Sequence, residues 1–133
     1  MRSEQFQVDT SHRTVVDLTD RVAAFLAAQD EGLVNVFVPH ATAGLAVVET
    51  GSDSDDDLVD ALRRLLPRDD RYLHRHGSAG HGADHLVPAL MSPSLNVPVQ
   101  QGRLLLGTWQ RIVLVDLNAD NPRRSVRLSL LSG

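Results

Sequence analysis

The sequence contains no cysteine, and its thirteen basic residues are all arginine, so lysine is also absent. Without cysteine the chain forms no disulfide, no thiolate metal site and no cysteine nucleophile. Without lysine it has neither a Schiff-base amine nor the lysine of a phosphate-binding P-loop. These classes of chemistry are therefore excluded.

Long apolar runs are also missing. No stretch approaches about 18 consecutive apolar residues, and the first residues, MRSEQFQVDTSHRTVVDL, lack the apolar region of a signal peptide. We therefore expect a cytoplasmic protein with no membrane partner. The formal net charge is -4, whereas nucleic-acid binding relies on a basic face that neutralises phosphates. We expect no nucleic-acid partner.

The length of 133 residues predicts a single domain over residues 1–133. Strand and helix patterns are mixed along the chain, which indicates an α+β fold. The expected strands are Phe6–Val8, Thr14–Leu18, Leu33–Val38, Ala46–Glu49, Asn96–Val99, Arg103–Leu106, Gln110–Leu117 and Ser125–Leu131. The expected helices are Thr19 or Asp20 to Gln29, Asp56–Leu66 with Leu58, Leu62 and Leu65 on one face, and a short one around Ala83–Met91.

Histidines gather in two places. His40 follows an expected strand, and His74, His76, His81 and His85 lie within twelve residues, in or next to a long polar loop over residues 68–82. Histidine is the commonest metal ligand, so this pattern predicts a metal site. His81 and His85 have the i, i+4 spacing of a chelating pair on a helix, but we expect His81 to lie in the loop before the helix, which disfavours that pair.

Several segments closely resemble, in order and spacing, the YjbQ-like family of small bacterial and archaeal proteins. These are His40–Leu45 with Glu49 downstream, Tyr72–His74, His85–Leu86, Ser94–Val99 and Gly102–Gln110. Some members of that family are labelled secondary thiamine-phosphate synthases. The resemblance implies a compact α+β fold with a mixed or antiparallel sheet and two to three helices. It also implies a homotrimer and a pocket lined by histidines.

The same resemblance implies roles for individual residues. The positions shared with the family fall on His40, His74 and His85, which are the expected ligands of a divalent metal, zinc first. His76 and His81 do not match the family and are expected to be bystanders. Among the remaining matches, we expect Glu49 to transfer protons, Gln110 or Thr42 to orient polar groups, Arg124 to anchor an anion, and Trp109 to contact the substrate.

Two classes of function stay open. Three neutral imidazoles can hold zinc and leave a fourth position open, which predicts a metal-dependent enzyme acting on a small phosphorylated or heterocyclic substrate. The alternative is a non-catalytic trimeric protein that binds a metal or a small anion at the same pocket. Thiamine-phosphate synthesis displaces pyrophosphate, which usually requires Mg²⁺ held by carboxylates. We therefore expect that activity, where present, to be secondary.

Overall fold

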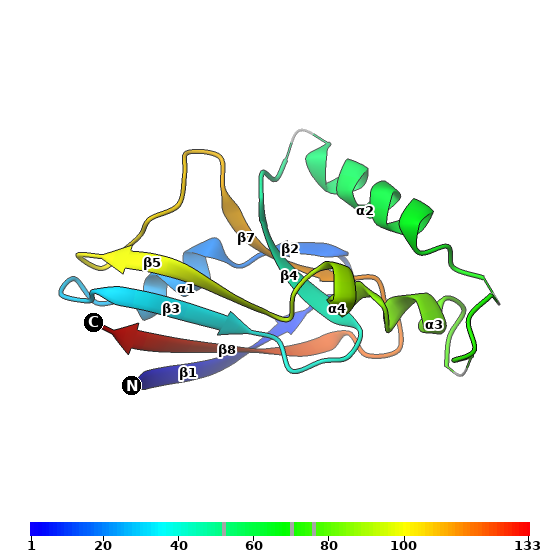
Figure 1. Cartoon of the computed structure of the whole chain (residues 1–133), viewed down its shortest axis with the longest axis horizontal. Coiled ribbons are helices and arrows are strands. Elements are labelled where there is room, and N and C mark those ends of the chain that lie inside the picture. The colour runs from blue at the N-terminus through cyan, green and yellow to red at the C-terminus, as the bar shows by residue number, and fades with distance from the viewer. Residues whose placement is uncertain (52, 70, 76) are drawn as a thin grey trace.

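The computed structural model describes residues 1–51, 53–69, 71–75 and 77–133, and it is an α+β fold, as predicted. Figure 1 shows its strands and short helices. The strands are β1 (Arg2–Asp9), β2 (Val15–Asp17), β3 (Gly32–Phe37), β4 (Ala43–Val48), β5 (Ser94–Gln100), β6 (Arg103–Leu104), β7 (Arg111–Asp116) and β8 (Arg123–Ser132). The helices are α1 (Thr19–Phe25), α2 (Ser54–Leu65), α3 (His81–Asp84) and α4 (Val87–Leu90). Among the described residues, no helix is long and apolar enough to cross a membrane.

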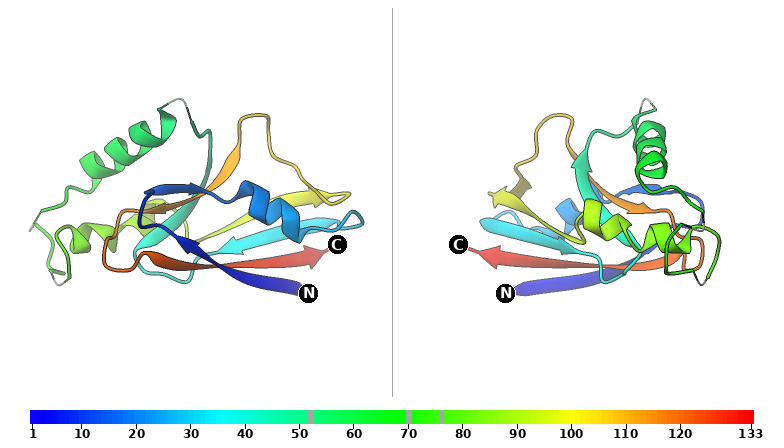
Figure 2. Two further views of the ribbon diagram at one scale, coloured as in Figure 1. Left: turned by 180° about the vertical axis from the view of Figure 1, so that it is seen from behind. Right: turned by 45° about the vertical axis from the view of Figure 1, so that its right-hand side comes forward.

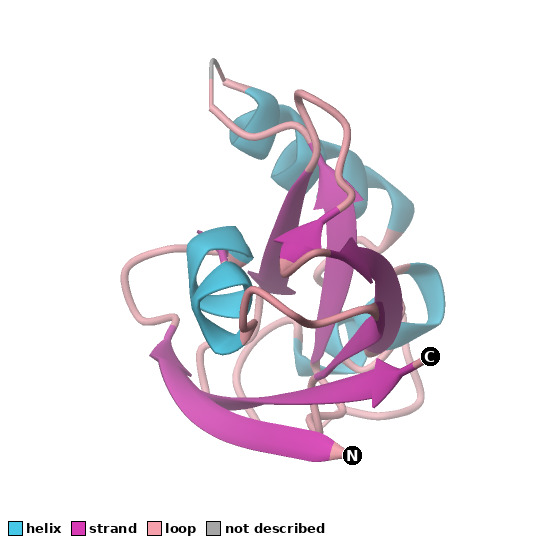
Figure 3. Cartoon of the chain, turned by 90° about the vertical axis from the view of Figure 1, so that its left-hand side faces the viewer, coloured by secondary structure: helices cyan, strands magenta, loops and turns pink. Residues whose placement is uncertain are grey.

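The strands form two sheets. One has five strands in the order β1-β8-β3-β5-β6, and the other has three in the order β2-β7-β4. Every strand pair in the described part of the chain is antiparallel. Figures 2 and 3 show the helices at the periphery of the strands, with α1 and α2 on different sides. The expectation of a mixed or antiparallel sheet is thus met by two antiparallel sheets.

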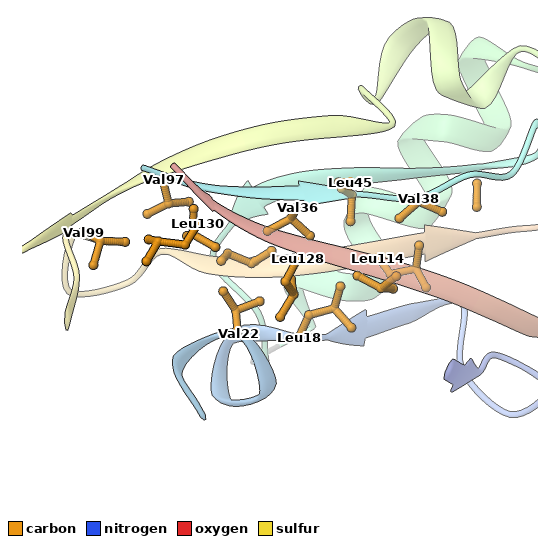
Figure 4. Packing of buried hydrophobic residues seen from close by; sticks show 14 residues of the cluster. Leu18, Val22, Val36, Val38, Leu45, Val97, Val99, Leu114, Leu128 and Leu130 are labelled. Carbon is orange, nitrogen blue, oxygen red and sulfur yellow. The ribbon is translucent and has the colours of Figure 1, made fainter. Parts of the chain in front are cut away.

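The main hydrophobic core lies between the two sheets. Ile112 and Leu114 of β7 face it from the three-stranded sheet, and both are fully buried. Figure 4 shows Leu114 near Leu45 of β4 and Leu128 of β8, while Val97 and Val99 of β5 lie at the other end of this core. The other members of this core are Leu18, Val22, Val34, Val36, Val38, Ala43, Leu45, Val97, Val99, Val126, Leu128 and Leu130.

The second core lies on the other face of the three-stranded sheet. Val113 and Val115 alternate with Ile112 and Leu114 along β7 and therefore point to the opposite side. They pack with Val15 of β2, Leu62 of α2, Val87 of α4 and Met91, which directly follows α4. On α2, Leu62 is buried and Leu58 is partly buried, but Leu65 is 68% exposed. The expected apolar face of this helix is therefore narrower than its leucine spacing predicted.

Helix α1 ends at Phe25, four residues earlier than expected. The Asp30 carboxylate accepts a hydrogen bond of 2.7 Å from the Ala27 N–H and also pairs with Arg2. The Asp30 N–H in turn donates to the Ala27 carbonyl at 2.9 Å. Aspartate commonly stabilises turns by bonding to nearby backbone in this way. The turn over residues 27–30 replaces the last predicted turn of helix.

The helix expected around Ala83–Met91 is two short helices. Pro88 lies in the first turn of α4, where its missing N–H costs nothing, whereas inside a continuous helix the proline ring would clash with the preceding turn. The first of the two helices, α3, begins at His81 rather than at Ala83. The expectation that His81 lies in the loop before the helix is therefore wrong.

Gly44 permits close contact between β4 and the end of α4. A Cβ atom at this position would lie 2.3 Å from the Met91 carbonyl oxygen, well inside any real contact. The adjacent Leu45 N–H donates to the Ser92 carbonyl at 2.8 Å, which holds the two segments at this separation. The glycine therefore fixes α4, and with it the chain that leads back to α3, against the three-stranded sheet.

We expect Gly44→Ala to lower the free energy of unfolding by about 1–3 kcal/mol, because the added methyl group must push the Met91 backbone away. Denaturant unfolding followed by circular dichroism measures the change. Gly107→Ala is the matched control, since a Cβ there would meet only the end of the Gln110 side chain, at 3.3 Å. An equal loss of stability in both variants would contradict this account of Gly44.

Candidate metal centre

Three histidine side chains converge at the end of the molecule that holds α3. His74, His81 and His85 each offer a ring nitrogen, and these nitrogens all lie within 4.8 Å of one another. The Nε2 atoms of His81 and His85 are 2.8 Å apart. The ring centroid of His74 lies 4.3 Å from that of His85 and 5.2 Å from that of His81. The three rings can therefore contact one small ion together.

Local structure explains how these rings meet. His81 and His85 are one helical turn apart, and the His85 N–H donates to the His81 carbonyl at 3.2 Å. His74 comes from the polar segment that precedes α3, and its backbone lies against this helix at Gly82. A Cβ on Gly82 would be 2.4 Å from the His74 carbonyl oxygen, so only glycine permits this approach.

The Asp120 carboxylate contacts the His81 ring at Nδ1, the nitrogen that faces away from His85. The Asp120 Oδ2 atom is 3.0 Å from His81 Nδ1 and accepts a hydrogen bond of 3.1 Å from the Ser78 N–H. The Ser78 N–H, together with His81, holds the pKa of Asp120 below its usual range, although partial burial opposes this. Histidine ligands in metalloproteins commonly donate their second ring N–H to such a carboxylate, which fixes the ring orientation.

A buried polar network continues from this pair into the protein. Asp84 of α3 has no exposed surface, and it is ion-paired with Arg68. Its Oδ2 atom also accepts a hydrogen bond of 2.9 Å from the Asn118 side-chain amide. Because an unpaired buried carboxylate is costly, these two partners hold α3 at a fixed position.

The donor set determines which ions fit. Three imidazole nitrogens suit zinc, which takes four tetrahedral ligands in structural sites and keeps one position open in catalytic ones. They also suit other borderline transition metals, whereas Mg²⁺ and Ca²⁺ prefer oxygen ligands. The residues present therefore fit a zinc-type ion and fit Mg²⁺ poorly.

Two of the three predicted ligands lie in this cluster, and the third lies elsewhere. His74 and His85 are brought together, but among the described residues the group that can share an ion has His81 as its third member rather than His40. His40 follows β3, and its Nε2 atom accepts a hydrogen bond of 2.8 Å from the Ser125 N–H. His76, expected to be a bystander, lies outside the described residues.

Thr42 and Arg124 belong to an internal ion pair. Arg124, only 2% exposed, donates from Nε and Nη2 to the two carboxylate oxygens of Asp116 at 2.7 and 2.9 Å. The same Nη2 also donates to the Thr42 hydroxyl at 2.8 Å. Arg124, predicted as an anion anchor, thus binds Asp116 inside the protein, and Thr42, predicted as a polar orienter, accepts a hydrogen bond from Arg124.

Glu49, Gln110 and Trp109 lie at the other end of the three-stranded sheet. Val48 of β4 pairs with Arg111 of β7 next to these residues, whereas Ala43 pairs with Asp116 at the opposite end. Thr42 and Glu49 flank β4, Ala43–Val48, at its two ends, and the seven residue steps between them correspond to about 23 Å. Gln110 accepts a hydrogen bond of 2.8 Å from the Gly107 N–H, and Trp109 is 72% exposed. One chain therefore does not bring these residues to the histidines.

Asn118 and Asp120 were not among the residues predicted from the sequence. Both follow β7 in a turn, where Asn and Asp are common for purely local reasons, so nothing in the sequence separates them from ordinary turn residues. Asp120 reaches a histidine 39 positions away. For His81 a signal did exist, namely its i, i+4 spacing to His85.

The structure defines a two-sheet α+β protein with a cluster of three histidines, and comparisons identify its family. Residues 4–133 match the family described as UPF0047 protein YjbQ-like. The chain is 68% identical to a UPF0047 protein of Mycobacterium tuberculosis over 133 residues, which cover 100% of both chains. It is 34% identical to a UPF0047 protein of Archaeoglobus fulgidus, over 84% of this chain and 87% of the relative. The chain therefore belongs to the UPF0047, YjbQ-like family.

Solved structures agree with this assignment. A hypothetical protein from Aeropyrum pernix K1 superposes with a TM-score of 0.88 and 34% identity, covering 100% of both chains. A YbjQ-like protein of unknown function from Sulfolobus solfataricus P2 has a TM-score of 0.89 at 24% identity, covering 99% of this chain and 97% of the other. The second likeness shows the fold alone.

His40 should make stability depend on pH. Burial lowers the pKa of its imidazole, the nearby Arg124 cation lowers it further, and Asp116 opposes both. The folded state therefore takes up the proton less readily than the unfolded chain, whose histidine pKa is about 6.5. We expect the free energy of unfolding to fall as the pH drops through the window just below that value.

Urea unfolding of wild type and His40→Gln between about pH 7.5 and 5 measures this contribution, because the difference between their two pH profiles isolates His40 from the other histidines. The wild-type curve should drop more steeply than the variant's. His12→Gln, at an exposed position, is the comparison variant for the exchange of a histidine for glutamine. Parallel profiles for wild type and His40→Gln would refute the assignment.

Proposed function

We propose that this protein binds a divalent metal, zinc, through His74, His81 and His85, and acts as a metal-dependent enzyme on a small phosphorylated or heterocyclic substrate. The observation that carries the proposal is the convergence of three imidazole nitrogens within 4.8 Å. The Asp120 carboxylate, 3.0 Å from His81 Nδ1, adds the outer support that metal-binding histidines usually have. His81 takes the place in the ligand set that the sequence had suggested for His40.

The surroundings of the cluster favour a small substrate. A cavity of about 130 Å³ lies beside His74 and His81 and is also lined by Arg75 and residues of the glycine-containing segment 77–82. Its volume admits only a small group, and its lining carries both a cation, Arg75, and a carboxylate, Asp69. When bound, zinc would supply a Lewis acid and lower the pKa of its bound water toward neutrality. The three histidines would hold the ion, and Asp120 would keep the His81 ring in place.

The proposal includes a homotrimer, which the family resemblance implies. On the five-stranded sheet, Leu33 pairs across strands with Leu131, and both are exposed, as is Phe37 on the same strand as Leu33. These side chains supply apolar surface for a second copy. A trimer would also give Glu49 a role, because about 23 Å of strand separates it from the histidine end of its own chain. Glu49 would serve as proton-transfer group in the site of a neighbouring subunit.

The second candidate is a non-catalytic trimeric protein that binds a metal or small anion at the same cluster. The position of Glu49 and Gln110 at the far end of β4 and β7 favours it, because a single chain then has no predicted proton-transfer group at the histidines. Thiamine-phosphate synthesis is proposed only as a secondary activity, since three histidines fit Mg²⁺ poorly.

Purified wild-type protein should carry about one zinc per chain. His74→Ala or His81→Ala should lose at least about 90% of this zinc, because two imidazoles bind zinc much more weakly than three do. Uptake should fall as the pH drops through roughly 6, since ligand imidazoles must be deprotonated. Inductively coupled plasma mass spectrometry after equilibrium dialysis measures the metal. His40→Ala is the matched control and should retain zinc.

Loss of metal in His40→Ala with retention in His81→Ala would favour the ligands that the family resemblance implies, His40, His74 and His85, and would contradict a role for His81. Equal metal content in all four proteins would remove the site.

Glu49→Gln separates the enzyme from the binding protein. If Glu49 transfers protons in a neighbouring site, this variant should keep its zinc and lose turnover by about 10²-fold or more. Turnover is screened on phosphorylated metabolites with and without added Zn²⁺, together with thiamine-phosphate formation from a pyrimidine diphosphate and a thiazole phosphate. Full turnover in Glu49→Gln would exclude the residue from the mechanism.

Co-expression of Glu49→Gln with His81→Ala adds a test of where the site lies. Mixed trimers combine an intact histidine cluster from one subunit with an intact Glu49 from another. Recovery of turnover that neither variant shows alone is expected for a site shared between subunits, and its absence would contradict sharing.

A further inference from the structure

Asn118 occupies a central position between the core and the histidine cluster. It is only 7% exposed and lies two residues beyond the end of β7. Its backbone N–H donates to Asp116 Oδ1 at 3.0 Å, and its side-chain oxygen accepts from the Asp120 N–H at 2.9 Å. Its side-chain NH₂ donates to Asp84 Oδ2 at 2.9 Å. One residue thus contacts three aspartates, each with a different polar group.

These contacts determine which way the amide faces. The side-chain oxygen must point at the Asp120 N–H, and the NH₂ must point at the Asp84 carboxylate, because a carboxylate only accepts hydrogen bonds. The opposite orientation would place the amide oxygen against Asp84, which is fully buried. The NH₂ group therefore also lies on the side of His81, 3.3 Å from its Nδ1 atom.

The amide and Asp120 make opposite demands on His81. Asp120 Oδ2, at 3.0 Å, can only accept a proton from Nδ1, whereas the NH₂ group of Asn118 can only donate one. Because Asp120 is closer and charged, the geometry favours a proton on Nδ1. The Nε2 atom of His81 then has a lone pair that faces His85 Nε2 at 2.8 Å, toward the centre of the cluster.

We propose that Asn118 is the positioning residue of the histidine cluster: it fixes the Asp120 turn and α3 relative to each other and so holds His81 with its proton on Nδ1 and its Nε2 lone pair toward the metal. The role in metal affinity rests on the proposed function, whereas the control of the His81 ring does not. Asn118 is not one of the three proposed ligands. It acts through Asp120 on one side of His81 and through Asp84 on the other.

The alternative is that Asn118 only satisfies buried polar groups in a turn. Loss of Asn118 would then lower stability and leave the proton on His81 and the affinity for metal unchanged. Asn35 provides a matched comparison, because its side-chain NH₂ makes bonds of 2.9 and 3.0 Å to Ser94 and Asn96 on the five-stranded sheet. Asn35→Ala removes a similar set of hydrogen bonds away from the histidines.

The test compares Asn118→Ala with wild type and Asn35→Ala in the full chain. Long-range ¹⁵N–¹H correlation spectra of the metal-free proteins report which His81 nitrogen carries the proton. Wild type and Asn35→Ala should show a proton on Nδ1. Asn118→Ala should show a mixture of both tautomers, because the Asp120 turn loses its bond to Asn118 and its carboxylate is no longer held against Nδ1, an effect that outweighs loss of the opposing amide N–H. Titration with Zn²⁺ against a chelator should give an affinity about 10–100-fold lower for Asn118→Ala, and a change below about 3-fold for Asn35→Ala.

Each outcome decides the proposal. An unchanged His81 tautomer together with unchanged Zn²⁺ affinity in folded Asn118→Ala would overturn it, and so would a wild-type His81 protonated on Nε2. If Asn118→Ala does not fold, Asn118→Ser, which keeps a hydroxyl for the Asp120 N–H, takes its place, and if neither folds the wild-type tautomer decides. If wild type binds no Zn²⁺ but the tautomer responds to Asn118→Ala, the metal function fails and the positioning role stands.

Discussion

Burial of β7 on both faces is the constraint on which the rest of the structure depends. Ile112 and Leu114 contribute to the core between the two sheets, while Val113 and Val115 contribute to the core under α2 and α4. Most antiparallel strands bury only one face, so this strand needs an uninterrupted apolar sequence. Both cores share β7, and neither sheet nor helices can move far without exposing apolar surface on one side of it.

At the end of β7, hydrogen bonds of a buried aspartate take over from apolar packing. Asp116 has a completely buried side chain, which is tolerable only because Arg124 and the Thr10 hydroxyl bind its oxygens. Asp116 in turn accepts a hydrogen bond from the Asn118 N–H, and the Asn118 side chain forms hydrogen bonds with Asp84 and Asp120. The position of the histidine cluster is thereby tied to the strand that is buried on both faces through a short series of hydrogen bonds.

The sequence predicted the parts of the fold that hydrophobic periodicity controls. The strands around Leu33–Val38 and Gln110–Leu117 and the helix that ends near Leu65 are present within a few residues, because burial of their side chains dominates their local choices. The predictions were wrong where a single polar or cyclic side chain decides. Asp30 ends α1 by forming a turn, and Pro88 divides the last predicted helix in two. Each of these effects involves about one hydrogen bond, which contributes about 1 kcal/mol. Such local effects do not change the spacing of apolar residues, so a periodic pattern does not reveal them.

The candidate site was predictable in part, for a related reason. His74 and His85 stand in matching family positions, and the i, i+4 spacing of His81 and His85 was visible in the sequence. This spacing brings the two rings together only if both residues lie on one helix, which depends on where α3 begins. Segment 77–82 has little apolar surface of its own, and a fixed conformation needs partners elsewhere in the chain. Asp120 is such a partner, because one of its oxygens binds both the Ser78 N–H and His81. A turn after β7 thus orders a loop some forty residues earlier, and this dependence exists only in three dimensions.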